Sequence, residues 1–324
     1  MPEDLRIDAA LTAFSTCADR FVREGYRPSE SLEAMVERAG RIRGLKAIAM
    51  DYPTTFADPD VALATLGGAG LGVGMVEVDL YSSPQWKLGS FTAPDEATRK
   101  EALRLAKEAM DFCAATNGAD VQLWLGQDGY DYGFQVDYAA SWERLLEAIR
   151  EVAEYRSDVK VTVEYKIKEP RNKCHISTVG RVWAIIETLG LPNVGATLDV
   201  GHSLMAQENP AEAAAILGRL GRLYHLHLND CYRDWDHDMA PGSVNFWETI
   251  ELFYWLEEVG FEGWWGIDIY PYREDGATAL QLAVDSIYWF RELAWRVREA
   301  GIGEYLVAHD ALGAQQLLRQ VICK

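Results

Sequence analysis

Eight short apolar segments alternate along this chain with longer segments of helical periodicity. This alternation indicates parallel strands joined by crossover helices, because parallel strands need long connections between them. Each short segment is continuously apolar or nearly so, as expected of strands that are covered on both faces. The expected strands are residues 11–16, 45–50, 71–81, 120–126, 160–166, 194–200, 222–228 and 264–270.

Eight strand–helix units in a chain of 324 residues predict an α/β fold, a closed (β/α)8 TIM barrel. A doubly wound open sheet is the alternative, but no glycine-rich phosphate loop follows the first expected strand. No linker rich in Pro, Gly and Ser divides the sequence, so we expect a single barrel domain over residues 1–300. Residues 301–324 are expected to form a short C-terminal helical extension that covers the barrel or a neighbouring subunit.

Start and stop signals in the helical segments support this organisation. Asn209 is expected to cap a helix that has Pro210 at its first position. Asn245 and Glu248 have the spacing of a capping box, and the helix that follows is expected to end at Gly260. Local sequence therefore predicts where two of the crossover helices begin.

Charge and cysteine usage limit the partners of this protein. The chain has 50 Asp and Glu against 31 Lys and Arg, and its net charge of -19 would repel a nucleic-acid backbone. No apolar run is long enough to span a membrane, and the first residues lack the pattern of a signal peptide. The five cysteines are widely spaced and include no CxxC pair, which favours reduced thiols. We therefore expect a cytoplasmic protein that binds neither nucleic acid nor membranes.

Metal-ligating side chains occur at the ends of the last four expected strands, where TIM barrels place their functional residues. The four candidate ligands are Glu164, Asp199, His227 and Asp268. A single polar residue at a strand end is usually a hydrogen-bonded structural group. Three carboxylates that converge with one imidazole, however, would repel one another unless a cation neutralised them. The set predicts a hard divalent ion, with Mn²⁺ expected first and Mg²⁺, Co²⁺ or Zn²⁺ as alternatives.

A second group of candidate residues lies beside the first in sequence. His202 follows strand six in DVGH, and Asp236 and Asp238 follow strand seven in DWDHD. These three are expected to form a second metal site, with a solvated acidic loop as the alternative. Lys166, at the end of strand five, is expected to stabilise a substrate oxygen, with a rim salt bridge as the alternative.

Two further residues are assigned from strand ends. Trp124 closes the fourth expected strand, and its indole beside polar residues suits stacking on a sugar, with core packing as the alternative. His225 is expected to face the opposite side of its strand from His227 and to be structural.

Five motifs, taken in order, resemble the xylose isomerase-like TIM-barrel superfamily, whose sugar isomerases include xylose isomerase and L-rhamnose isomerase. VEYK (163–166) looks like the family's strand-five Glu-x-Lys, and LDVGH (198–202) resembles its acid-x-x-His. HLND (227–230) with DWDHD (234–238) resembles the strand-seven ligand and the paired acidic residues. The two remaining motifs, similar to the strand-four and strand-eight segments, are LWLGQDG (123–129) and IDIYPYRED (267–275).

The resemblance implies a metal-dependent aldose–ketose isomerase that acts on a small carbohydrate. The four strand-end ligands would hold a structural metal and the three residues of the second group a catalytic metal. Lys166 would contact the substrate carbonyl or C1 oxygen. The segment AMDYP (49–53) departs from the sugar isomerases, which commonly have a histidine there for ring opening. Asp51 is the candidate substrate-binding residue in its place.

Other activities remain as alternatives. A sugar 3-epimerase would use the same metal with two carboxylates that deprotonate and reprotonate one carbon, but Asp236 and Asp238 would have no task. Metal-dependent lyases also resemble this pattern, among them dehydratases of inositol catabolism and the large subunit of C-glycoside deglycosidases. A deglycosidase subunit would form a hetero-oligomer, whereas an isomerase is expected to form a homo-oligomer.

Two function classes are disfavoured. A repair endonuclease of the endonuclease IV type needs a histidine-rich trinuclear site and a basic groove, which six histidines and a charge of -19 do not supply. A non-enzymatic sugar-binding module on a degenerate barrel is disfavoured because the ligand set is complete.

Overall fold

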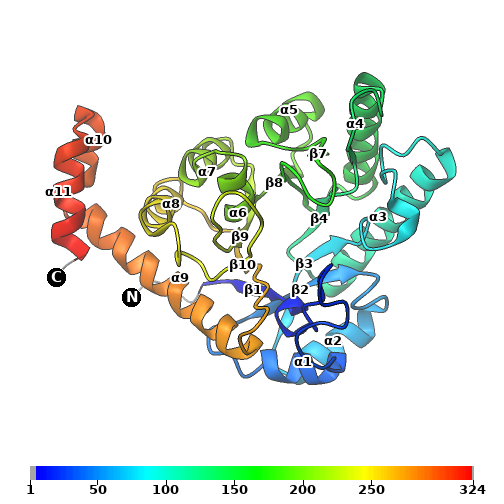
Figure 1. Ribbon diagram of the computed structural model, residues 1–324, viewed down its shortest axis with the longest axis horizontal. Coiled ribbons are helices and arrows are strands. Elements are labelled where there is room, and N and C mark those ends of the chain that lie inside the picture. Colours follow the sequence, from blue (N-terminus) through cyan, green and yellow to red (C-terminus); the bar gives the residue numbers. More distant parts are fainter. Residues whose placement is uncertain (1–4, 323–324) are drawn as a thin grey trace.

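The computed structural model describes residues 5–322 and contains a closed barrel of eight parallel strands surrounded by helices (Figure 1). Strands pair in the order β1-β10-β9-β8-β6-β4-β3-β2, so barrel strands that follow one another in sequence are neighbours in space. The predicted single (β/α)8 barrel is confirmed. The barrel strands are β1 (Ile7–Ala10), β2 (Ala47–Tyr52), β3 (Gly72–Val78), β4 (Asp120–Trp124), β6 (Val161–Glu164), β8 (Val194–Asp199), β9 (Leu223–Leu228) and β10 (Trp264–Ile267).

Helices cover the outside of the barrel, and a small antiparallel ribbon of β5 (Gly129–Tyr130) and β7 (Lys173–Cys174) lies apart from it. Two 3-10 helices, η1 (Leu11–Phe14) and η2 (Pro84–Trp86), belong to the loops. The α-helices up to the end of the barrel are α1 (Leu32–Ala39), α2 (Pro59–Gly68), α3 (Glu96–Thr116), α4 (Tyr138–Tyr155), α5 (Val179–Leu189), α6 (Val200–Met205), α7 (Pro210–Arg219), α8 (Phe246–Glu258) and α9 (Gly276–Glu299).

The predicted C-terminal helical extension is also confirmed. It consists of α10 (Ile302–Ala308) and α11 (Ala311–Ile322), which pack on each other and on the far end of α9 (Figure 1). No residue of α11 is fully buried, so this helix does not close over the barrel. Within residues 5–322, no helix is both long and apolar enough to cross a membrane.

The prediction of the first strand, at residues 11–16, is wrong. Leu11–Phe14 forms a 3-10 helix, and the barrel strand lies just upstream at Ile7–Ala10. Asp8 interrupts the apolar pattern of the true strand because its side chain points into the barrel. The following segment is a short apolar run, and such runs do not distinguish a strand from a helix. The other seven expected strands overlap barrel strands.

The helix signals are confirmed in part. The side chain of Asn209 caps α7, with Pro210 at the first helical position, as predicted. The left-handed conformation predicted for Gly260 after α8 is also present, with φ of 64°. Asn245 makes no side-chain cap, and the predicted capping box is wrong. Its amide instead donates to the buried carboxylate of Asp230, which fixes the preceding loop.

A charged network lies inside the barrel. His225 Nδ1 is 3.0 Å from Asp120 Oδ2, and its Nε2 is 3.2 Å from Asp8 Oδ1. All three side chains are buried. Burial opposes the charged imidazole, but the two carboxylates raise the pKa of His225 to about 9. His225 therefore carries a positive charge between two buried negative charges.

Glycines make room for this network. A Cβ at Gly74 would lie 2.1 Å from Asp8 Oδ2, and one at Gly266 would lie 2.9 Å from His225 Nε2. The expectation that His225 faces away from His227 is wrong, because residues two apart in a strand point to the same face. Both imidazoles point into the barrel, with ring centroids 5.9 Å apart.

We expect His225→Asn to destabilise the fold by roughly 3–5 kcal/mol, because it leaves buried carboxylates without their counter-charge. His309→Asn is the matched control, because His309 is exposed between α10 and α11 and its change should cost less than about 0.5 kcal/mol. Chemical denaturation followed by circular dichroism measures both. Equal stability of the two variants would contradict the role given to the network.

Candidate metal centre

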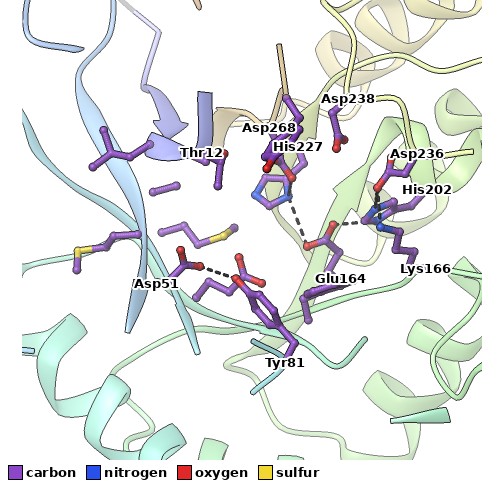
Figure 2. Close-up of a pocket in the computed structure, with 18 of the residues that line it drawn as sticks. Thr12, Asp51, Tyr81, Glu164, Lys166, His202, His227, Asp236, Asp238 and Asp268 are labelled. Atoms are coloured by element: carbon purple, nitrogen blue, oxygen red, sulfur yellow. Dashed lines mark hydrogen bonds and ion pairs between the residues drawn. The ribbon is translucent and has the colours of Figure 1, made fainter. Parts of the chain in front are cut away.

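A pocket of about 290 Å³ opens where the barrel strands end (Figure 2). Its volume is close to the lower limit of about 300 Å³ for small-molecule sites, so it suits a small ligand. Nine of the ten predicted site residues line it: Asp51, Trp124, Glu164, Lys166, His202, His227, Asp236, Asp238 and Asp268. The tenth, Asp199, is fully buried beside them at the end of β8.

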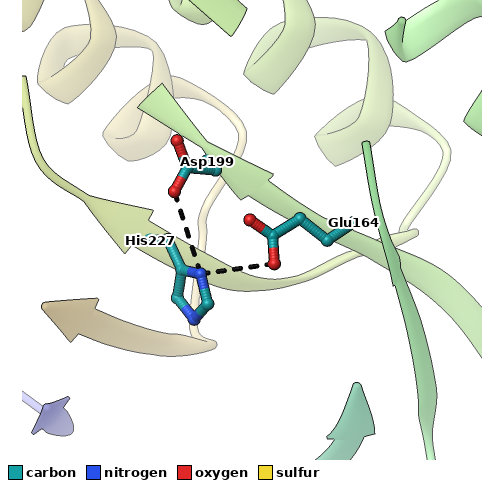
Figure 3. Close-up of side chains that lie close together, drawn as sticks. All are labelled: Glu164, Asp199 and His227. Carbon is teal, nitrogen blue, oxygen red and sulfur yellow. Dashed lines mark ion pairs between the residues drawn. The ribbon is translucent and has the colours of Figure 1, made fainter. Parts of the chain in front are cut away.

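The four predicted metal ligands meet around one nitrogen atom. His227 Nδ1 is 3.4 Å from Glu164 Oε2, 3.8 Å from Asp199 Oδ2 and 3.6 Å from Asp268 Oδ2. Figure 3 shows Glu164 and Asp199 approaching the imidazole from neighbouring strands. The ligand atoms of Glu164, Asp199 and His227 all lie within 4.8 Å of one another. Parallel strand ends thus bring together residues that are far apart in sequence.

This arrangement fits a divalent cation. His227 Nδ1 is buried and has no hydrogen-bond partner among residues 5–322, although carboxylate oxygens lie on several sides of it. Buried polar atoms almost always have a partner, so an orphaned nitrogen among carboxylates is a donor set that a metal ion completes. One imidazole nitrogen and three carboxylates suit Mn²⁺, Mg²⁺, Co²⁺ or Zn²⁺.

The pKa shifts of the carboxylate ligands also indicate a site for a cation. Burial raises the pKa of Asp199 to about 7 and raises that of Asp268 as well. Burial would also raise the pKa of Glu164, but the charges of His227 and His202 outweigh it and lower the pKa to about 2. A cation would favour the ionised form of every carboxylate in the group.

The second predicted group adjoins the first through Glu164. His202 Nδ1 is 2.9 Å from Glu164 Oε1, and His202 Nε2 is 3.0 Å from Asp236 Oδ2 (Figure 2). The same Asp236 oxygen is 2.6 Å from Lys166 Nζ. Lys166 thus neutralises Asp236 in this structure, and a second cation at Asp236 would require the ammonium group to move. The second metal site therefore stays a prediction.

The loop between β9 and α8 carries Asp236 and Asp238 and is held at its base by Asp230. The Asp230 carboxylate accepts hydrogen bonds from the backbone N–H groups of Val244 and Asn245 and from the Asn245 amide. Asp230 is buried, so these bonds are shielded from water. The loop is anchored at both ends, which fixes the position of Asp236 and Asp238.

Aromatic side chains form the wall that faces the metal ligands. The Trp124 ring lies 5.2 Å from Lys166 Nζ and packs edge-to-face on Tyr81, with ring centroids 4.7 Å apart. The Tyr81 hydroxyl donates to Asp51 Oδ1 at 2.7 Å (Figure 2). Trp124 and Asp51, predicted separately, therefore belong to one continuous wall of the pocket.

Four residues of this region are absent from the sequence-based prediction. Glu77 and Tyr81 line the pocket from β3 and the loop that follows it. Gln122 donates to Glu164, and the Asn229 amide donates to both Asp199 and Asp238. Glu77 and Gln122 each break an apolar strand at an inward position, a signal that GMVEVDLY and DVQLWLG contain.

Comparisons with known proteins agree with this fold. Residues 44–293 match the family model described as "Xylose isomerase-like TIM barrel". The xylose isomerase of Thermus thermophilus is 33% identical over 223 residues, which cover 66% of this chain and 58% of that protein. The match thus spans less than two thirds of the relative's length.

Solved structures resemble the chain in fold. An L-ribulose 3-epimerase has a TM-score of 0.72 at 18% identity, covering 91% of this chain and 97% of its own. A D-allulose 3-epimerase from Methylomonas sp. has a TM-score of 0.68 at 16% identity, covering 89% of this chain and 99% of its own. A 3-keto-D-glucoside 4-epimerase from E. coli has a TM-score of 0.65 at 16% identity, covering 89% of this chain and 99% of its own. Identities this low show a shared fold alone.

We expect Asp199→Asn to weaken Mn²⁺ binding by more than roughly 100-fold, since even outer-shell changes cost about 10- to 100-fold. Asn retains the helix cap that Asp199 provides at His202 N, so the fold should survive. Asp234→Asn is the matched control, because that side chain is 80% exposed. Titration calorimetry and elemental analysis measure binding. Unchanged Mn²⁺ affinity in Asp199→Asn would place the metal elsewhere.

Proposed function

The chain belongs to the xylose isomerase-like TIM-barrel family, and from this premise we propose that it is a metal-dependent sugar isomerase that interconverts aldoses and ketoses. The observation that carries the proposal is the junction at Glu164. One of its carboxylate oxygens faces His227 in the metal-ligand group, and the other faces His202 in the adjoining group. The similarity to a xylose isomerase supports the same class of reaction.

The proposed metal would be held by Glu164, Asp199, His227 and Asp268. A divalent ion bound there would polarise oxygen atoms of the open-chain sugar and stabilise the negative charge that develops on them. All four ligands come from strand ends, which are rigid, and Gln122 and Asn229 orient two of the carboxylates by hydrogen bonds. The chain therefore holds its ligands in place through a second set of buried contacts.

Lys166 supplies fixed positive charge beside Asp236 in the adjoining group. Burial would lower its pKa, but Asp236 and Glu169 outweigh burial and raise the pKa above its usual range. The ammonium group therefore stays protonated and is unsuited to act as a base. In this proposal it stabilises developing charge on the C1 or carbonyl oxygen of the sugar. Asp236 positions both Lys166 and His202 for that task.

A 3-epimerase needs only two carboxylates and a metal at one carbon. It would leave Lys166, His202 and Asp236 without a role in the reaction, although these three are joined by contacts of 2.6 and 3.0 Å. The isomerase therefore accounts for more of the site. Action on a small carbohydrate without a partner chain, homo-oligomer formation and a cytoplasmic location complete the proposal.

We expect the purified chain to convert an aldose into its ketose when Mn²⁺ is present. Removal of metal by a chelator should abolish this conversion, and added Mn²⁺ should restore it. A panel of aldoses, ketoses and glycosides followed by NMR identifies the products. Conversion of ketoses only into their C3 epimers would replace isomerase by epimerase. Activity that requires a second chain would replace it by a lyase.

We expect Lys166→Met to lower kcat by about 100- to 1,000-fold while Mn²⁺ stays bound, because a charge-stabilising donor is lost. Lys168→Met is the matched control, because Lys168 contacts the backbone oxygen of Asp234 outside the pocket. Its kcat should change by less than about threefold, in line with the small effects of most surface changes. Loss of bound Mn²⁺ in Lys166→Met would show that Lys166 acts on the metal site itself.

We expect Asp238→Ala to leave the first metal bound while it reduces turnover. Asp238 lines the pocket, and the Asn229 amide links it by hydrogen bonds to Asp199 of the first group. Elemental analysis and steady-state kinetics measure the two effects separately. If Asp238→Ala also empties the first site, the division into two groups is wrong.

A further inference from the structure

An aldose is mainly cyclic in water, so an isomerase of the kind proposed above must first open the sugar ring. Ring opening removes the proton of the anomeric hydroxyl and delivers a proton to the ring oxygen as the carbon–oxygen bond breaks. A base and an acid that contact the same sugar perform both transfers. In the proposed reaction, the metal-ligand group and the Lys166 group have other tasks. The candidate acid and base for ring opening therefore lie on the opposite wall of the pocket.

Asp51 and Glu77 are two carboxylates side by side on that wall. They are register partners at the ends of β2 and β3, and both line the pocket. Neighbouring strands lie about 4.8 Å apart, which brings the two side chains to one spot. Figure 2 shows Asp51 with Tyr81 on the side of the pocket away from Lys166 and Asp236. The pocket is small, so a bound sugar touches both sides.

We propose that Asp51 and Glu77 act together as the acid–base pair that opens the sugar ring. The ionised carboxylate accepts the proton of the anomeric hydroxyl, whose electron pair forms the carbonyl. The bond between the anomeric carbon and the ring oxygen breaks, and the ring oxygen takes the proton of the neutral carboxyl. One proton enters the pair and one leaves, so no other reactant is needed. The inference rests on the proposed function.

The surroundings of the pair favour one shared proton. Carboxylates this close repel each other when both are ionised. At this spacing one proton held between the two carboxyls relieves the repulsion, and burial also favours the neutral form of each carboxyl by raising its pKa.

Tyr81 holds Asp51 in position. Its hydroxyl donates to Asp51 Oδ1, and its backbone oxygen accepts a hydrogen bond from Gln127 Nε2 at 3.0 Å. Trp124 packs against its ring. Both carboxyls line the pocket, where a bound sugar would contact them.

Asp60 provides a matched control outside the pocket. It is an exposed acid in the first turn of α2, shortly after β2. Asp60→Asn makes the same chemical change without altering the neighbours of the proposed pair.

Ring opening is measured directly as acceleration of mutarotation, which does not require isomerisation. Freshly dissolved α-D-xylose and α-L-rhamnose are followed by NMR with the Mn²⁺-loaded protein, because the signals of the two anomers are separate from those of a ketose. We expect the unmodified chain to accelerate mutarotation of at least one of the two sugars. Asp51→Asn or Glu77→Gln should lower that acceleration by about 100-fold or more, as for loss of a general acid or base.

Three results would overturn the inference. They are no acceleration of mutarotation by the unmodified chain, no loss in Asp51→Asn and Glu77→Gln, and an equal loss in Asp60→Asn. Calorimetric titration with Mn²⁺ verifies that each variant keeps an intact site. Mutarotation without any isomerisation by the unmodified chain would instead overturn the proposed function and leave the pair standing.

Discussion

Negative charge crowded into the mouth of the barrel is the constraint on which the rest of the site depends. Six carboxylates line the pocket, and the carboxylate of Asp199 is buried beside them. Separate interactions compensate this negative charge. The ligands around His227 have the donor set of a divalent ion, and Lys166 neutralises Asp236. In the proposed ring-opening pair, Asp51 and Glu77, one shared proton relieves the repulsion. Each of these interactions corresponds to one proposed chemical task.

A second group of buried charged side chains lies inside the barrel, one layer below the pocket. His225 lies between Asp8 and Asp120, and Gly74 and Gly266 provide the space for these side chains. Here the histidine nitrogens are both paired, whereas His227 Nδ1 in the layer above is an orphan. Two histidines on one strand, two residues apart, thus differ in their contacts. His225 completes its own ion pairs, whereas His227 is a proposed metal ligand.

Much of this arrangement could be predicted from sequence because it depends on strand order. The ends of consecutive parallel strands meet in space, so the four ligand positions converge whatever the details of the loops. The strand that contains Asp8 was not predictable in the same way, because its polar side chain is satisfied by partners distant in sequence, His225 and the backbone N–H of Met75. Glu77 was missed for a similar reason. Its importance comes from its register with Asp51, which local sequence does not specify.

The choice between an isomerase and an epimerase depends on how Asp236 is used. Its Oδ2 atom is shared by His202 and Lys166, and its loop is clamped at Asp230. A clamped loop and a shared oxygen fix a lysine ammonium beside Asp236 and His202 at a cost in desolvation. Epimerisation at one carbon develops negative charge on one carbonyl oxygen, which a metal ion alone can stabilise. A reaction that moves a carbonyl between two carbons develops charge on two oxygens, and a metal centre with an adjacent ammonium matches that distribution.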